Sequence, residues 1–166
     1  MLTVSDGVAA GTRADASGDA IAARLAGLGF EVERRLVPDE VPAIGAAIRE
    51  GAAAHPLVVT TGGTGLTPRD VTPQATAAVL DYEVPGVAEA MRAEGRKSTP
   101  MAALSRGLAG VAGRALVLNL PGSPRGSMES LEAAIPVLDH ALETLSGPFD
   151  HDTARGAARR DLPPGA

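Results

Sequence analysis

L-V-V-T-T-G-G-T-G-L-T-P-R-D, at residues 57–70, is the stretch that decides the fold of this chain. It begins with a short apolar run after Pro56, which is typical of a buried central strand in an α/β sheet. Three glycines then fall within residues 62–65, where the backbone can adopt positive φ angles and approach a ligand closely. Thr72 and Pro73 are typical of a helix N-cap and the first helical residue. The stretch therefore predicts a strand, a glycine loop and a helix, and such a loop lies where open α/β sheets bind ligands.

The glycine loop is typical of an anion-binding site, although it matches neither common phosphate-binding motif. Successive backbone N–H groups in such a loop can converge on one anion. No lysine stands where a Walker A motif requires it, and Pro68 occupies the place of the last glycine in G-x-G-x-x-G. A tight strand-to-helix turn is the alternative interpretation. The charged pair Arg69-Asp70 directly after the glycines favours a functional site.

Length and composition limit the class of protein. The 166 residues suit one domain with a full hydrophobic core. Aromatic residues make up 2% of the chain, so the core must be aliphatic, and base stacking on aromatic side chains is not an expected binding mode. The net charge of -5 also argues against a nucleic-acid partner.

The absence of cysteine and of long apolar runs indicates the cellular compartment in which the protein is expected. Without cysteine the chain can form no disulfide, thiolate nucleophile or cysteine-ligated zinc site, which fits a reducing compartment. The N-terminus lacks a basic segment followed by an apolar one, and no apolar run reaches the ~20 residues of a membrane helix. We expect a soluble cytoplasmic protein with no membrane partner.

Strands and helices alternate along the rest of the chain. This alternation predicts an α/β three-layer sandwich with a mostly parallel central sheet and an antiparallel strand at one edge. The domain is expected to span residues 1–148, and the Ala-, Arg- and Pro-rich residues 149–166 to form a disordered tail. Further strands are expected over residues 1–4, 30–36 and 115–120 and near residue 112. Helices are expected over residues 17–29, 41–54, 73–80 and 87–93, just before Ser105, and from Ser127 onwards.

Capping residues mark the expected starts of three further helices. Ser17, Asp39 and Ser127 each precede a helical apolar pattern and have side chains that can accept a hydrogen bond from the first turn. Pro136 lies inside the last of these helices and predicts a kink. Residues 7–16 and 82–86 are expected to be loops.

Candidate functional residues gather at the carboxyl ends of the expected strands. The three histidines, His55, His140 and His151, adjoin no motif, which argues against a histidine-based triad or an imidazole base. Backbone, hydroxyl, amide and carboxylate groups remain, and they suit phosphates together with a hard cation such as Mg²⁺. A phosphate monoester with a second pKa of about 6 could act there as nucleophile without a strong base. The set comprises Ser5, Asp6, Asp39, Thr60, Thr61, Gly62, Gly63, Thr64, Gly65, Asp70, Ser105, Asn119, Gly122 and Ser123.

Seven short motifs occur together and in order along the chain. They are T-V-S-D at 3–6, L-V-P-D-E at 36–40, T-T-G-G-T-G at 60–65, R-D-V-T-P at 69–73, V-P-G-V-A-E-A-M-R at 84–92, L-S-R at 104–106 and L-N-L-P-G-S-P at 118–124. The set resembles the molybdopterin adenylyltransferase family, the Mog/MoaB type of molybdenum cofactor biosynthesis protein, up to about Pro148. The departure from the family pattern is the short start of the first strand.

The resemblance implies an enzyme with a molybdopterin-binding α/β fold, assembled as a homotrimer or, alternatively, a hexamer. Such an enzyme uses Mg-ATP to adenylylate the terminal phosphate of molybdopterin and releases pyrophosphate. The two functional aspartates of the family fall on Asp39, which is also the expected Mg²⁺ ligand, and on Asp70. Substrate binding is implied for Ser5, Asp6, Thr61, Gly62, Gly63, Thr64, Gly65, Ser105, Asn119, Pro121, Gly122 and Ser123.

Two alternatives stand beside this activity. A hydrolase of the related competence-damage type shares the domain and could cleave a nucleotide pyrophosphate. A module of the MoaB kind could instead bind molybdopterin as a scaffold without chemistry, although binding an anion alone gains nothing from the carboxylates of Asp39 and Asp70. A mixture of protein, molybdopterin and Mg-ATP separates the three, because adenylylated pterin forms in only one case.

Overall fold

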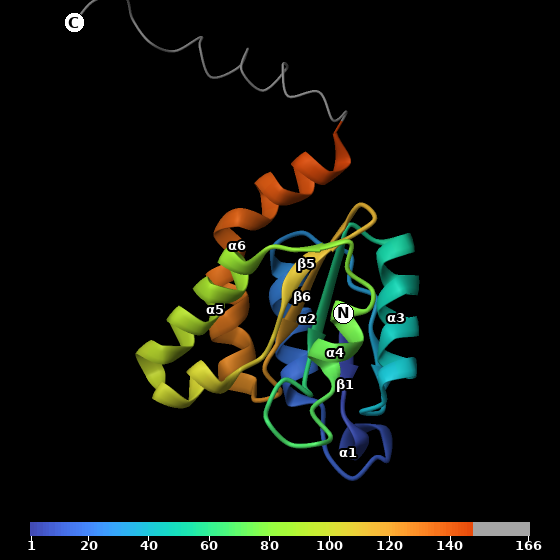
Figure 1. Cartoon of the computed structure of the whole chain (residues 1–166), viewed down its shortest axis with the longest axis vertical. Coiled ribbons are helices and arrows are strands. Elements are labelled where there is room, and N and C mark those ends of the chain that lie inside the picture. The colour runs from blue at the N-terminus through green and yellow to red at the C-terminus, as the bar shows by residue number, and fades with distance from the viewer. Residues whose placement is uncertain (148–166) are drawn as a thin grey trace, which may run out of the picture.

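A six-stranded sheet lies at the centre of the computed structural model, which describes residues 1–147 (Figure 1). The strands follow the order β2-β1-β3-β6-β5-β4. Neighbouring strands from β2 to β6 are parallel, whereas β5 runs antiparallel to both β6 and β4. The predicted α/β sandwich with a mostly parallel sheet is confirmed, and the predicted tail lies outside the described residues. The strands are β1 (Leu2–Val4), β2 (Arg35–Val37), β3 (Leu57–Thr61), β4 (Tyr82–Glu83), β5 (Ala109–Ala112) and β6 (Ala115–Leu120).

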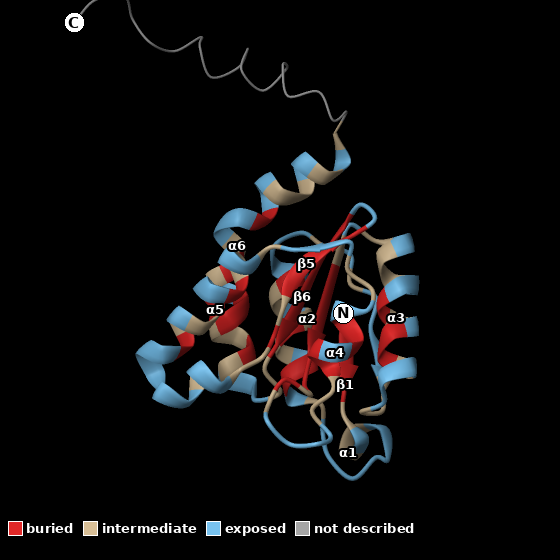
Figure 2. Cartoon of the chain, viewed as in Figure 1, coloured by how far each residue is buried: buried red, intermediate tan, exposed pale blue. Residues whose placement is uncertain are grey.

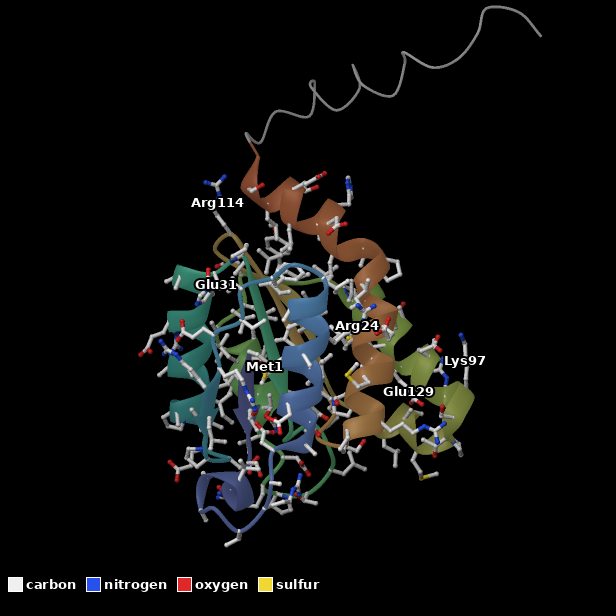
Figure 3. The ribbon with its side chains drawn as sticks, turned by 180° about the vertical axis from the view of Figure 1, so that it is seen from behind. Met1, Arg24, Glu31, Lys97, Arg114 and Glu129 are labelled. Carbon is white, nitrogen blue, oxygen red and sulfur yellow. The ribbon has the colours of Figure 1, made fainter. Side chains whose placement is uncertain are left out.

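Helices cover both faces of the sheet (Figures 1 and 3). Helices α3 and α4 pack on one face, and α2, α5 and α6 pack on the other. Figure 3 shows α2 beside α6, where Arg24 forms an ion pair with Glu132 (2.6 Å). The helices are α1 (Asp6–Ala9), α2 (Ala16–Gly27), α3 (Val41–Ala54), α4 (Thr72–Ala77), α5 (Pro85–Ser98), the 3-10 helix η1 (Pro100–Leu104) and α6 (Pro124–Ser146).

The two central strands, β3 and β6, contribute side chains to the core on both faces of the sheet. In β3, Val58 packs towards α3 and Val59 towards the opposite layer, and in β6 Val117 and Leu118 divide in the same way. Successive side chains of a strand point to opposite faces, so a strand that is covered on both sides must be apolar throughout. Figure 2 shows β6 buried along its length, and β3 is buried after its first residue. This is the physical reason why the apolar runs at 57–59 and 115–120 identified the sheet.

Two predictions for the N-terminal half are wrong. The strand expected over residues 30–36 is reduced to β2, because β1 offers three residues for pairing and these pair with Arg35–Val37. Phe30 still packs against the core without being part of a strand. The loop expected over residues 7–16 contains the short helix α1, which Ser5 caps by accepting a hydrogen bond from the N–H of Val8 (3.3 Å).

The predicted caps of α2 and α6 are also wrong. Asp15 caps α2, and Ser123 caps α6, each through a side-chain oxygen that accepts a first-turn N–H. Ser17 and Ser127 lie inside the first turns and are buried. Helix α2 ends at Gly27, earlier than the predicted Gly29, and Leu28, which follows it, is 38% exposed.

The C-terminal half differs from prediction mainly at its edge. The short strand β4 forms within the predicted loop at 82–86, so β5 is not the outermost strand. Helix α4 ends at Ala77, earlier than predicted, and α5 extends well beyond the predicted range of 87–93. Pro136 lies inside α6, and this helix changes direction along its length in Figures 1 and 3, as the proline predicts.

Candidate functional site

A cleft of about 960 Å³ opens at the carboxyl ends of β1, β3 and β6. These three strands are parallel neighbours, so the segments that follow them meet at one edge of the sheet. Most of the predicted site residues line this cleft: Ser5, Asp39, Thr61, Gly62, Gly63, Thr64, Gly65, Asp70, Ser105, Pro121, Gly122 and Ser123. Asp6, Thr60 and Asn119 are not among its lining residues.

All four carbonyl groups of the glycine loop, residues 62–65, are held by donors from outside the loop. Thr72 donates to the first two carbonyls, through its hydroxyl (2.9 Å) and its N–H (3.1 Å). Arg106 donates to the last two, through its N–H (3.0 Å) and its guanidinium Nε (2.7 Å). The N–H groups of Gly63 and Thr64 meet no acceptor within residues 1–147, and both residues line the cleft. The loop therefore keeps backbone donors available for an anion.

A second loop, residues 121–123, is built in the same way. The hydroxyl of Thr61 donates to its first carbonyl (2.8 Å), and the hydroxyl of Ser17 donates to its second (2.8 Å). Within the described part of the chain, the N–H groups of Gly122 and Ser123 donate to no carbonyl or side chain. The loop leads directly into the N-terminus of α6, where the helix dipole favours a negative charge.

The two loops lie against each other, and the glycines at both positions allow this close approach. A Cβ on Gly122 would lie 3.2 Å from the Cα of Gly62. A Cβ on Gly62 would lie 2.1 Å from the carbonyl oxygen of Val4, and the φ of Gly62 is +104°. The ends of β1, β3 and β6 are thus packed together, and two sets of backbone donors lie side by side.

Asp39 lies beside the glycine loop in a reciprocal pair with Asp6. The N–H of Asp6 donates to Asp39 Oδ2 (2.8 Å), and the N–H of Asp39 donates to Asp6 Oδ1 (3.0 Å). The other oxygen, Asp39 Oδ1, is 3.1 Å from the point that a Cβ on Gly63 would occupy. The predicted capping role of Asp39 is therefore wrong, since α3 begins without a side-chain cap and the carboxylate lies against the loop.

Asp6 links this pair to the loop that follows the glycines. Its carboxylate accepts a hydrogen bond from Arg69 Nε (3.0 Å). The backbone N–H of Asp39, and then Arg69, hold the pKa of Asp6 below its ordinary value. Asp6 is therefore ionised at neutral pH and holds Arg69 at the rim of the cleft.

Asp70 closes the loop between the glycines and α4. Its Oδ2 accepts hydrogen bonds from the N–H (2.8 Å) and the hydroxyl (2.7 Å) of Thr67. Burial raises the pKa of Asp70, but hydrogen bonds from Thr67 and Gly65 outweigh it and bring the pKa below the ordinary value. Arg106 also donates to the Asp70 carbonyl. The carboxylate is therefore ionised and is already used to hold the loop.

Asn119 lies beneath the cleft rather than in its wall. Its side chain is fully buried, and Nδ2 donates to the hydroxyls of Thr60 (3.0 Å) and Thr76 (3.0 Å). Its Oδ1 accepts the N–H of Leu108 (3.3 Å). The amide thus connects β6 to β3, α4 and the segment before β5.

Asn119→Ala is expected to lower the free energy of unfolding by about 2–4 kcal/mol, because it leaves a cavity and unpaired buried groups. Urea unfolding measures this change, and the affinity of the folded variant for inorganic pyrophosphate, used as an anionic probe of the cleft, should stay within about twofold of wild type. An unchanged stability with a large loss of pyrophosphate affinity would instead place the amide in contact with ligand.

The sequence interpretation missed several charged residues of the cleft wall. Arg13, Asp15 and Arg92 line the cleft, and Arg92 donates to the carbonyl of Gly107 (3.1 Å). The guanidinium of Arg13 makes no hydrogen bond or ion pair within residues 1–147. Arg92 ends the motif at 84–92 but was not assigned to the site, and no local signal marks Arg13 and Asp15, since their positions depend on how the chain packs before α2.

The described residues hold no group of three or more His, Cys, Asp or Glu side chains that could bind a metal by themselves. A site for Mg²⁺ does not require one, because this ion keeps several waters and uses one or two carboxylates together with substrate phosphates. Asp39 offers such a carboxylate, with Oδ1 beside the glycine loop.

Among residues 1–147, none of the helices combines the length and the apolar character of a membrane-spanning segment.

Fold and site together define an α/β domain with a cleft at the carboxyl edge of its sheet, lined by two loops that keep backbone N–H groups available. Residues 1–140 match the sequence profile of a family described as the probable molybdopterin binding domain. The chain belongs to this family, as its ordered motifs predict.

Similar proteins have names that refer to molybdopterin or to the molybdenum cofactor. The chain is 37% identical to the molybdenum cofactor synthesis protein cinnamon of Drosophila melanogaster over 96% of its own length and 28% of the relative. It is 47% identical to molybdopterin adenylyltransferase of Haemophilus influenzae over 62% of its length and 53% of the relative. It therefore spans about half or less of these two proteins. A solved structure of MoaB from Thermus thermophilus is 57% identical, with a TM-score of 0.83 over 89% of this chain and 94% of that one.

Proposed function

We propose that this protein is a molybdopterin adenylyltransferase of molybdenum cofactor biosynthesis. It would bind molybdopterin and ATP, let the terminal phosphate of molybdopterin attack the α-phosphorus of ATP, and release adenylylated molybdopterin and pyrophosphate. The observation that carries the proposal is the pair of touching glycine loops with tied-back carbonyls and available N–H groups. Two phosphate-bearing substrates need two adjacent anion sites, and relatives of this chain are named for this reaction.

The chain's own residues would act by positioning and by charge. The glycine loop and the loop at 121–123 hold the reacting phosphates in line, and their N–H groups stabilise the charge that develops on the oxygens. No general base is required, since a phosphate monoester is largely deprotonated at neutral pH. Arg13 would add a positive charge at the rim, where its guanidinium is free to turn towards a phosphate.

The carboxylates of Asp39 and Asp70 would have different roles. Asp39 would hold Mg²⁺ through Oδ1, while Oδ2 stays bound to the N–H of Asp6. Bound Mg²⁺ would neutralise phosphate charge and orient the ATP phosphates. Asp70 would act through the loop: its bonds to Thr67 and Gly65 keep the glycine backbone in place. Ser5 and Ser105 would contribute hydroxyls to the cleft wall.

We further propose a cytoplasmic homotrimer, with a hexamer as the alternative, on the family resemblance alone. Light scattering on the purified protein distinguishes the two assemblies from a monomer.

Purified protein mixed with molybdopterin and Mg-ATP is expected to yield adenylylated pterin and pyrophosphate in equal amounts. Chromatography of the pterin and a pyrophosphate assay measure the two products. Pterin binding without either product would identify a scaffold of the MoaB kind. Cleavage of a nucleotide pyrophosphate in the absence of pterin would identify a hydrolase.

A further inference from the structure

A negative charge lies in the wall of the cleft, close to the loops that would take phosphates. Asp15 lines the cleft, and its side chain is 17% exposed. Its Oδ1 caps α2 by accepting the N–H of Gly18 (3.0 Å), and its Oδ2 accepts the hydroxyl of Thr3 (2.7 Å). Thr3 is paired in the sheet with Thr61, the residue directly before the glycine loop. The carboxylate of Asp15 therefore lies at the base of the glycine loop.

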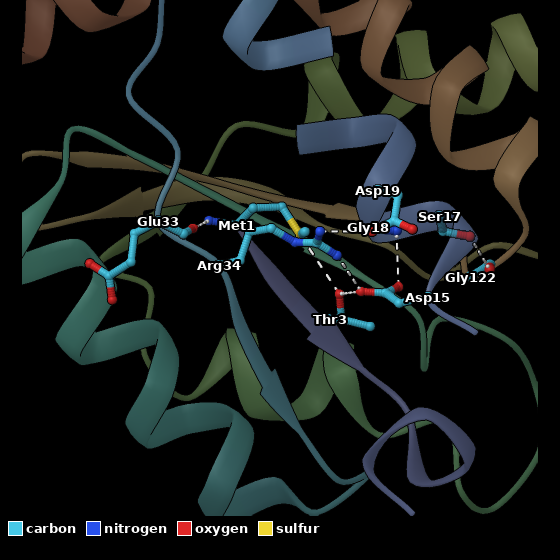
Figure 4. A network of polar contacts seen from close by, with 9 residues as sticks. All are labelled: Met1, Thr3, Asp15, Ser17, Gly18, Asp19, Glu33, Arg34 and Gly122. Carbon is cyan, nitrogen blue, oxygen red and sulfur yellow. Dashed lines mark hydrogen bonds and ion pairs between the residues drawn. The ribbon is translucent and has the colours of Figure 1, made fainter. Parts of the chain in front are cut away.

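The same turn of α2 also holds the second loop. The hydroxyl of Ser17 donates to the carbonyl of Gly122 (2.8 Å), as Figure 4 shows. The N-terminus of α2 thus contacts the second loop directly and contacts Thr3 of β1, the strand beside the one that leads into the glycine loop. Its helix dipole favours a nearby anion, but an unpaired carboxylate at the cap would oppose that attraction.

Arg34 reaches Asp15 from outside the cleft. Its Nη2 lies 2.9 Å from Asp15 Oδ2, and its Nη1 lies 2.7 Å from Asp19 Oδ1. Figure 4 shows the guanidinium between these two carboxylates, on the side of Asp15 where Thr3 and Met1 lie. Arg34 is not among the residues that line the cleft, so it cannot serve as a direct ligand there.

We propose that Arg34 is a positioning residue of the anion site, which neutralises Asp15 from behind the cleft wall. Asp15 can then cap α2 and align its first turn without repelling a phosphate-bearing ligand. This inference rests on the proposed function, because it assigns a role in binding the phosphates that the two loops would take. Arg34 acts on the ligand through charge and through no contact of its own.

The test uses inorganic pyrophosphate as the probe and isothermal titration as the measurement. Arg34→Gln is expected to weaken pyrophosphate binding about tenfold at low ionic strength, and the difference should shrink at high salt. Arg35→Gln is the matched control, because Arg35 also pairs with two carboxylates, Glu33 (2.8 Å) and Glu50, but away from the cleft. This control should bind pyrophosphate like the wild type.

A second variant separates charge from architecture. Asp15→Asn keeps the helix cap, since asparagine caps about as well as aspartate, but it removes the charge that Arg34 compensates. The double variant Arg34→Gln, Asp15→Asn is therefore expected to bind pyrophosphate at least as tightly as the wild type.

Three results would overturn the inference. Arg34→Gln could bind like the wild type, or the double variant could stay as weak as Arg34→Gln, which would make the role purely architectural. If the wild type itself fails to bind pyrophosphate or ATP, the proposed function fails together with this inference. If the wild type binds and Arg34→Gln binds with the same affinity, only this inference fails.

Discussion

Asp39→Asn is expected to lower the rate of adenylylated molybdopterin formation by about two to three orders of magnitude, with little change in stability. The asparagine oxygen can still accept the hydrogen bond that the N–H of Asp6 donates to Asp39 (2.8 Å). The negative charge beside Gly63 is lost, and with it the proposed attraction of Asp39 for Mg²⁺. Because α3 begins without a side-chain cap, the variant has no capping bond to lose. Product chromatography and thermal melting measure the two quantities.

Asp81→Asn provides a matched control for this result. Asp81 also accepts a backbone N–H, from Gly113 (2.7 Å), but it does not line the cleft. The control should retain the wild-type rate, and molybdopterin binding should survive in both variants. Wild-type product formation by Asp39→Asn would remove Asp39 from the reaction.

Gly63→Ala is expected to abolish measurable binding of ATP and pyrophosphate. The φ of Gly63 is +62°, and a Cβ there would lie 2.3 Å from the hydroxyl oxygen of Thr72 and 3.1 Å from Asp39 Oδ1. Thr72 would have to move, although its hydroxyl and N–H hold the first two carbonyls of the glycine loop. The loop would then lose the conformation that leaves its N–H groups available.

Gly113→Ala separates this effect from backbone strain. Gly113 has a similar φ of +60°, but a Cβ there would meet no atom within 4 Å. Gly113→Ala should lose about 1–2 kcal/mol of stability to the left-handed backbone conformation, as urea unfolding measures, and Gly63→Ala should lose more because its Cβ also overlaps Thr72. Only Gly63→Ala should lose ligand binding. If Gly63→Ala and the wild type give equal ATP and pyrophosphate titration curves, the glycine loop is only a turn and not a binding site.

The sequence predicted the location of the candidate site because strand ends are local features. The apolar runs before Gly62 and Pro121 identify two strands, and the glycines directly after each run mark the loops. The roles of single side chains were harder to predict, and Asp39 illustrates why. A carboxylate before a helix is typical of a cap. The Asp39 carboxylate instead accepts a hydrogen bond from the N–H of Asp6, which lies 33 residues earlier in the chain.

The sequence by itself determined the layered α/β fold, the two glycine loops and the family, since each depends on short-range pattern: strand period, positive-φ glycines and ordered motifs. The tertiary structure alone decided which groups hold those loops. Ser17 reaches the carbonyl of Gly122 across 105 residues, and Thr61 reaches that of Pro121 across 60. The sequence does not identify these donors, because any of its many hydroxyl side chains could equally cap a helix or face solvent. Packing of α2 on the sheet and pairing of β3 with β6 bring these particular hydroxyls to the loop carbonyls, and the N–H groups of the loops stay available for an anion.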